Sequence, residues 1–179
     1  IKESIERTYE FIDDVCVVHP GVFSPLSVQM PETAVKKAIA GLTALCEFAA
    51  DRGLRIAVEN LTSANMLMGR YPDELIQLVR GVNMDNLGVC LDVGHANTTK
   101  KLDEFLGITA KAEDVKIIHM HASDNFGADD LHLPLGEGNL DWEKVVHGIN
   151  NNGYEGIVVL ELRSLEGGIE SLEFIKKVL

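Results

Sequence analysis

An α/β fold built on parallel strands is predicted by three features of this 179-residue sequence. Short apolar runs alternate with helical patterns along the chain, each run is continuous rather than alternately polar, and no linker rich in glycine, serine or proline interrupts the series. Continuously apolar strands are buried on both faces, as they are in parallel sheets that helices cover. The length suits one hydrophobic core, so residues 1–179 are predicted to form a single domain.

The pattern predicts five strands that alternate with helices. Apolar residues at helical spacing run up to Ile12, and the first strand is expected at 15–18. Thr33 is expected to cap a long helix, which ends at Gly53. The other strands are expected at 54–58, 87–91, 115–120 and 157–160, and the other helices at 72–80, 102–112, 142–151 and 168–179.

The spacing of these strands favours a barrel over an open sheet. A polar residue stands at or just past the end of each strand, at intervals of 29–40 residues: His19, Glu59, Asp92, His121 and Glu161. A (β/α)₈ barrel of about 250 residues uses roughly 31 residues for each unit. An open sheet would bind its ligand beside a glycine-rich loop, and the sequence has no GxGxxG or Walker-type loop. We therefore predict an incomplete (β/α)₈ barrel of five consecutive units, with about 70 residues and three strands absent on the N-terminal side.

Charge and composition argue against several kinds of partner. Sixteen lysines and arginines stand against 28 aspartates and glutamates, and a net charge of −12 does not suit a nucleic-acid partner. No apolar run is long enough to span a membrane, and no signal peptide precedes the first polar residues. The three cysteines lack CxxC spacing, which predicts neither a disulfide framework nor a thiolate zinc site. We therefore expect a reducing, cytoplasmic location.

Acidic residues and a histidine stand at the ends of four successive strands, at Glu59, Asp92, His121 and Glu161. Parallel strands end at one rim, so these side chains should converge there. Buried charges are costly unless they are paired or metal-bound, and three carboxylates would repel one another without a cation. Three oxygen ligands and one imidazole suit Mn²⁺, Mg²⁺, Co²⁺ or Zn²⁺. The sequence therefore predicts a divalent metal centre. The alternative is that each carboxylate caps a helix or pairs with a basic residue.

Other polar residues near this rim are predicted to contact substrate. His95 follows Asp92 by three residues and could bind a second metal or a substrate hydroxyl. Asp130 and His132, two residues apart in a long polar loop, could ligate a metal or contact a phosphate. A Pro-Gly turn should hold His19 over the rim. An ordinary loop position is the alternative for His95, Asp130 and His132.

Some histidines, the tryptophan and the cysteines are assigned to the scaffold. His119 and His121 share one face of their strand, and His119, the deeper of the two, is expected to form a hydrogen bond within the core. His147 lies in a helical pattern, and Trp142 is expected to pack against the core. The cysteines are expected to be small core residues.

Six segments, in order over nearly the whole chain, match a known pattern: Val18-His19-Pro20-Gly21, Ala57-Val58-Glu59-Asn60, Leu91-Asp92-Val93-Gly94-His95, His119-Met120-His121-Ala122-Ser123-Asp124-Asn125, Asp130-Leu131-His132-Leu133-Pro134-Leu135-Gly136-Glu137-Gly138 and Leu160-Glu161. In these segments the chain resembles the xylose-isomerase-like TIM-barrel superfamily, which holds sugar-phosphate isomerases and epimerases together with endonuclease IV, the apurinic-site nuclease. The resemblance implies that the five units are strands four to eight of the barrel. It also implies that the shared metal ligands are Glu59, Asp92, His121 and Glu161.

The resemblance implies different roles in the two branches of the superfamily. In epimerase-like members, the glutamates that correspond to Glu59 and Glu161 lie on opposite sides of the substrate and exchange its proton. The residue that matches His95 contacts sugar oxygens. In the nuclease branch, additional zinc ions are held at positions like His19, His95, Asp130 and His132.

Three features favour the isomerase branch: the acidic composition, the form of the segment from His132 to Trp142, and the lack of a basic and aromatic cluster for a flipped-out nucleotide. The predicted function is a divalent-metal-dependent isomerase or epimerase of a sugar or sugar phosphate, with one metal ion and proton transfer through a metal-stabilised enediolate. We expect no nucleic-acid or membrane partner, and self-association into a homo-oligomer is left open. One alternative is an endonuclease-IV-like apurinic-site phosphodiesterase with several zinc ions. A second is a non-catalytic or truncated barrel fragment, whose open strand edges would leave apolar surface uncovered.

Overall fold

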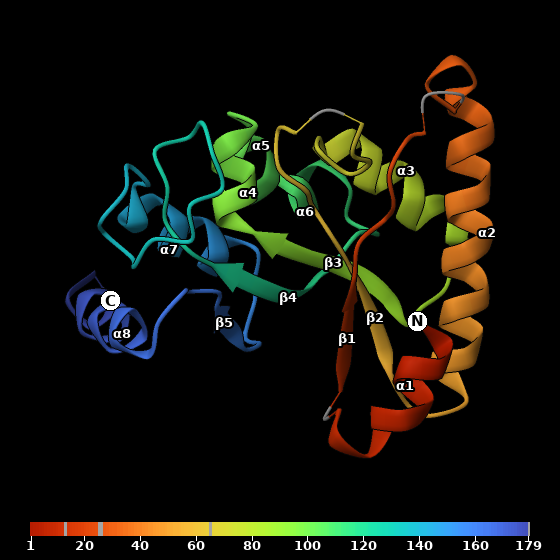
Figure 1. Ribbon diagram of the computed structural model, residues 1–179, viewed down its shortest axis with the longest axis horizontal. Coiled ribbons are helices and arrows are strands. Elements are labelled where there is room, and N and C mark those ends of the chain that lie inside the picture. The colour runs from red at the N-terminus through yellow and green to blue at the C-terminus, as the bar shows by residue number, and fades with distance from the viewer. Residues whose placement is uncertain (13, 25–26, 65, 179) are drawn as a thin grey trace.

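Five parallel strands, paired in sequence order, carry the candidate site (Figure 1). The computed structural model describes residues 1–12, 14–24, 27–64 and 66–178. The strands are β1 (Val15–Val18), β2 (Arg55–Glu59), β3 (Leu87–Asp92), β4 (Ile117–Ala122) and β5 (Val158–Leu160). They form a half-barrel, which is a partial TIM barrel, with β1 and β5 at its two edges. The predicted fold class is confirmed.

Helices connect the strands and cover the outer face of the sheet (Figure 1). In the described residues they are α1 (Lys2–Thr8), α2 (Pro31–Ala50), α3 (Pro72–Val82), α4 (Val93–Thr98), α5 (Leu102–Leu106), α6 (Ile108–Lys111), α7 (Trp142–Asn151) and α8 (Leu165–Val178), with short 3₁₀ turns at Tyr9–Phe11 and Ser27–Gln29. α2 packs against β2, α3 against β3, and α7 against α8. The core between these layers is apolar, and all six residues of β3 are buried. This burial on both faces is the reason for the continuous apolar runs.

Several element boundaries differ from the sequence predictions. α2 begins at Pro31, so Thr33 lies inside the helix and is not its cap, because a proline needs no hydrogen-bond partner in the first turn. The helix predicted at 102–112 is two short helices that meet at Gly107. α4 was not predicted. β4 begins and ends two residues later than expected, and α8 begins three residues earlier. The predicted end of the last helix, Leu179, lies outside the described residues.

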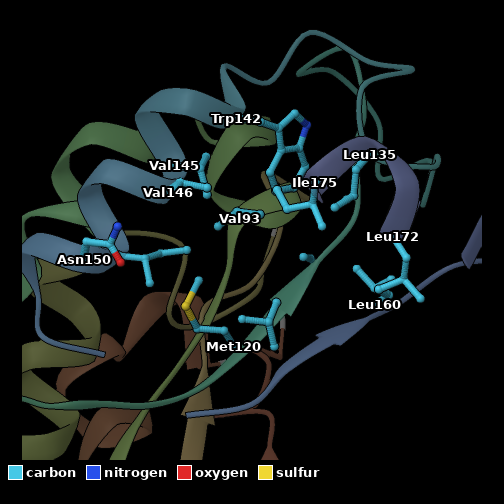
Figure 2. Close-up of a pocket in the computed structure, with 13 residues that line it drawn as sticks. Val93, Met120, Leu135, Trp142, Val145, Val146, Asn150, Leu160, Leu172 and Ile175 are labelled. Atoms are coloured by element: carbon cyan, nitrogen blue, oxygen red, sulfur yellow. The ribbon is translucent and has the colours of Figure 1, made fainter. Parts of the chain in front are cut away.

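The edge strand β5 is less buried than a strand inside the sheet. Val158 is 42% exposed and Val159 37%, and Ile157, which directly precedes the strand, is 67% exposed. Behind β4 and β5, an apolar cavity of about 280 Å³ lies between the sheet and helices α7 and α8 (Figure 2). Met120, Leu160 and Trp142 line it, with no carboxylate or histidine among its lining residues. This cavity is therefore on the helix side of the sheet and is separate from the charged rim.

No helix in the described part of the chain is both long enough and apolar enough to cross a membrane.

Candidate metal centre

Four side chains meet at the carboxyl ends of the strands. Glu59 ends β2, Asp92 ends β3, His121 is next to last in β4, and Glu161 directly follows β5. One ligand atom from each lies within 4.8 Å of those of the other three. Asp92 and His121 are paired across β3 and β4, which fixes their relative height in the sheet. The predicted convergence is present, and it follows from the common direction of parallel strands.

Glu59 is a buried carboxylate surrounded by histidines. Its Oε1 accepts a hydrogen bond from His121 Nδ1 at 2.8 Å, and its Oε2 lies 3.1 Å from Nε2 of His19. His95 Nδ1 lies 3.7 Å from Oε1. Burial works to raise the pKa of Glu59, but the hydrogen bond from His121 and the positive charge of the histidines outweigh it and lower the pKa. Glu59 is therefore held as a carboxylate.

Asp92 combines a capping role with an unpaired oxygen. Its Oδ1 accepts the backbone N–H of His95 at 2.7 Å and so caps α4, while the side chain of Asn60 bonds both the N–H and the carbonyl of Asp92. The Oδ2 atom is buried and has no hydrogen-bond partner among the described residues. Burial is the main reason that the pKa of Asp92 is raised to about 6. Asp92 therefore caps a helix, as the alternative interpretation expected, and also lies among the four converging side chains. A buried carboxylate oxygen without a hydrogen-bond partner is suited to bind a cation.

The donor set suits a divalent ion that prefers oxygen. It offers three carboxylates and one imidazole, and Mn²⁺, Mg²⁺, Co²⁺ and Zn²⁺ can all bind such a ligand set. Cys90, which the sequence assigned to the core, is buried, but its Sγ also lies within 4.8 Å of ligand atoms of Glu59 and His121. The sequence could have indicated this, because Cys90 stands two residues before Asp92 and residues two apart in a strand share one face. Burial, followed by the negative charges of Glu59 and Asp92, raises the pKa of the Cys90 thiol, which keeps it neutral.

A second group of donors lies beside the first: His95, Asp130 and His132. His95 Nδ1 donates to the carbonyl of Asn60 at 2.8 Å, and His132 Nδ1 donates to the carbonyl of Glu161 at 2.8 Å. Both rings therefore turn Nε2 towards Asp130, whose Oδ2 lies 3.3 Å from His95 Nε2 and 3.0 Å from His132 Nε2. The Oδ1 of Asp130 is buried without a hydrogen-bond partner among the described residues.

Protons and cations compete for this second group. Burial works to lower the pKa of His95, but the hydrogen bond to Asp130 and the charge of Asp92 outweigh it and raise the pKa to about 9. In turn, burial works to raise the pKa of Asp130, and the neighbouring histidines outweigh it and lower the pKa. The metal-free group is thus a histidinium–carboxylate pair. A metal ion would have to displace that proton, because a histidine ligand binds through a neutral nitrogen.

The other predicted residues lie as follows. His19 is exposed at the mouth, where it faces Glu59. His119 is half-buried, and its ring packs edge-on against His121 with the ring centroids 5.3 Å apart; among the described residues its side chain has no hydrogen bond of the kind expected within the core. His147 is exposed on α7, and Trp142 is buried as expected. Sequence reasoning missed Asn60 and Asp124, which are fully buried polar residues next to strand ends.

Comparison with known proteins finds relatives that match most or all of this chain. The chain is 33% identical over 181 residues to an uncharacterized protein of Methanocaldococcus jannaschii, a match that covers 100% of this chain and 61% of the relative. It is 28% identical to a probable endonuclease 4 of Staphylococcus carnosus, over 88% of this chain and 55% of that protein. The chain therefore spans little more than half the length of these relatives.

The solved structures that resemble this chain include an epimerase-like protein and an epimerase. A D-tagatose 3-epimerase-like protein is 33% identical with a TM-score of 0.91, and the match covers 99% of this chain and 66% of that one. An L-ribulose 3-epimerase, 16% identical with a TM-score of 0.77 over 99% of this chain and 65% of its own, shares the fold. The family model for the xylose isomerase-like TIM barrel matches residues 1–178. With the half-barrel and the four converging donors, that match establishes that the chain belongs to the xylose isomerase-like TIM barrel family.

Proposed function

We propose that this chain carries the metal centre of a divalent-metal-dependent isomerase or epimerase that acts on a sugar or a sugar phosphate. The observation that carries the proposal is the meeting of Glu59, Asp92, His121 and Glu161 within 4.8 Å, together with a buried oxygen of Asp92 that has no hydrogen-bond partner in the described part of the chain. Three carboxylates held so close repel one another unless a cation lies between them. The structural neighbours include a D-tagatose 3-epimerase-like protein and an L-ribulose 3-epimerase, which supports the reaction class.

The two glutamates differ in a way that suits proton transfer. A divalent ion bound by the four residues would stabilise the negative charge that develops on a substrate when a carbon-bound proton is removed. Glu59 is fixed by His121 and His19, and only 4% of its side chain is exposed. The side chain of Glu161 is 35% exposed and lies 3.2 Å from His121 Nδ1. This geometry supports Glu161 as the group that takes the carbon-bound proton from one side. Glu59, after taking up a proton from solvent, would deliver a proton from the other side, and Glu161 would release its own to solvent.

The remaining polar residues would bind the substrate. His19 stands exposed above Glu59, and His95 and His132 direct Nε2 into the same mouth. Imidazole nitrogens at these positions can donate hydrogen bonds to sugar hydroxyls or accept them, and the carboxylate oxygens can accept them. Their role is to orient the carbon-bound proton towards a glutamate, because a base acts only within hydrogen-bond reach.

Solvent isotope exchange tests this proposal. Ketopentoses, ketohexoses and their phosphates would be incubated in D₂O with Mn²⁺ and the protein, and deuterium at carbon would be measured by NMR. Glu161→Gln should reduce exchange by a factor of at least about 10³, as expected when a general base is lost, while Glu170→Gln, on the exposed surface of α8, should leave it unchanged. Exchange at the normal rate in Glu161→Gln would refute the assignment of Glu161. No exchange with any sugar would refute the reaction class.

A zinc-dependent phosphodiesterase of the endonuclease IV type is the second candidate, and the group of His95, Asp130 and His132 favours it. Two imidazole nitrogens and a carboxylate with an unpaired buried oxygen form a donor set for another ion. The net charge of −12 argues against a DNA substrate. Metal analysis separates the candidates together with an abasic-duplex assay. One ion per chain disfavours the nuclease, whereas three ions and strand cleavage would establish it.

A further inference from the structure

We propose that Asp124 is a positioning residue that locks the rim loop, residues 126–141, so that Asp130 and His132 face His95. The inference rests on the proposed function in one respect, since it takes Asp130 and His132 to bind metal or substrate. Asp124 itself is 0% exposed and stands three residues after His121. Among the described residues its side chain forms no hydrogen bond with either donor group, so an effect on the site would pass through the loop.

Four N–H groups converge on the Asp124 carboxylate, and we call this arrangement the Asp124 clamp. Its Oδ1 accepts from the backbone of Asn125 at 2.8 Å and of Leu140 at 3.2 Å. Its Oδ2 accepts from the backbone of Gly136 at 3.0 Å and from Trp142 Nε1 at 2.9 Å. In the described part of the chain, no lysine or arginine pairs with this carboxylate. The buried charge is therefore satisfied by N–H groups alone, and three of them belong to the far side of the rim loop or to the start of α7.

The clamp reaches His132 through the backbone. Asp124 and Leu133 form an antiparallel bridge, with N–H to carbonyl bonds of 2.8 and 2.9 Å in the two directions. The adjacent His132 has φ +50°, in the left-handed region that non-glycine residues enter at an energetic cost. Such a conformation persists only where surrounding bonds hold it. Here the bridge on one side and the His132 Nδ1 bond to the carbonyl of Glu161 on the other hold the ring against Asp130.

The rim loop has no room for a side chain at Gly138, where it passes the clamp. A Cβ atom on Gly138 would overlap Asp124 Oδ1 and the backbone of Asn125, so the loop can reach the carboxylate only because this residue has no side chain. The loop is also fixed to α8, because the Leu135 N–H donates to Ser171 Oγ at 2.9 Å. These contacts place the loop on a rigid support, which is what a ligand-bearing loop requires.

Replacement of Asp124 by asparagine isolates the clamp. An amide of the same shape accepts through one atom only, so its NH₂ group must face one pair of the four N–H donors whichever way it turns. Trp142→Phe removes the Nε1 donor alone and keeps an aromatic ring in the same place. The matched control is Asn86→Ala, which removes two hydrogen bonds, to the carbonyls of Cys46 and Leu54, at the opposite end of the sheet.

Two measurements test the proposal. In amide hydrogen exchange of the metal-free chain, Asp124→Asn should speed exchange of the rim loop at least tenfold, Trp142→Phe should speed it less, and Asn86→Ala should leave it unchanged. In a Co²⁺ titration followed by visible absorption, Asp124→Asn should weaken the ion bound through Asp130 and His132 by a factor of about 10–100 and leave affinity at the Asp92 centre unchanged.

Unchanged loop exchange in both Asp124→Asn and Trp142→Phe would overturn the clamp, and so would an equal rise in Asn86→Ala. Equal weakening of both ions would also overturn it, because a general loss of structure would then explain the result. If the unmodified chain binds a single ion, the second donor group fails as a metal site in the proposed function. The exchange measurement then still decides the clamp.

Discussion

The effect of Asp92→Asn on stability should depend strongly on whether a divalent ion is present. Asp92 is fully buried, and its pKa is raised from 3.8 to about 6, with burial as the main cause. The stability that protonated Asp92 provides is complete below pH 3.8 and is lost as the pH rises through about 6. At about 1.4 kcal/mol per pKa unit, the ionised group lowers the free energy of unfolding by about 3 kcal/mol at pH 8. Asparagine keeps the capping oxygen and carries no charge.

In the presence of a chelator at pH 8, the variant should therefore be about 1–3 kcal/mol more stable than the original chain. With Mn²⁺ at a hundred times its dissociation constant, the original chain gains about 2.7 kcal/mol, and the variant, with one ligand fewer, gains less. Urea unfolding followed by circular dichroism measures both differences. If Asp92→Asn destabilises the chain by the same amount with and without Mn²⁺, Asp92 is a structural cap only and the reasoning fails.

The other predictions concern pH and the rim loop. Because the pKa of His95 is raised from 6.5 to about 9, its contribution to the stability of the metal-free chain should be complete below pH 6.5 and lost as the pH rises to 9. In urea unfolding, His95→Asn should remove this part of the pH dependence of the free energy of unfolding. An unchanged pH dependence would contradict the pairing with Asp130. Gly138→Ala should destabilise the chain by about 1–3 kcal/mol, because the added methyl group meets backbone that cannot move aside. The control Gly168→Ala, which has open space in α8, should be neutral or slightly stabilising; equal effects of the two substitutions would refute the argument.

The sheet and the four converging residues could be predicted because they follow from simple periodicities. A strand buried on both faces, such as β3, gives an unbroken apolar run, and a charged residue after such a run marks the strand end. Parallel pairing then brings the ends together without further information. β4 was misplaced by two residues because Val115 is apolar and buried but lies before the strand, and propensity does not distinguish it from a strand residue.

The support around the site could not be predicted in the same way. The clamp joins Asp124 to Gly136, Leu140 and Trp142 across a loop that has no periodic pattern, so its contacts exist only in the folded chain. The second donor group depends on the left-handed conformation of His132, which its residue type does not signal. Asp130 and His132 could be identified from the chemistry of their side chains. Only the tertiary structure shows that the Asp130 carboxylate lies within 3.3 Å of the Nε2 atoms of both His95 and His132.

The most direct measurement of the central claim is anomalous diffraction at the manganese edge from crystals of the protein grown with Mn²⁺. The account predicts a strong peak within coordination distance of Glu59, Asp92, His121 and Glu161, with the Oδ2 atom of Asp92 among the ligands. A map without a peak there, or with these carboxylates turned apart or paired with basic side chains, would contradict it.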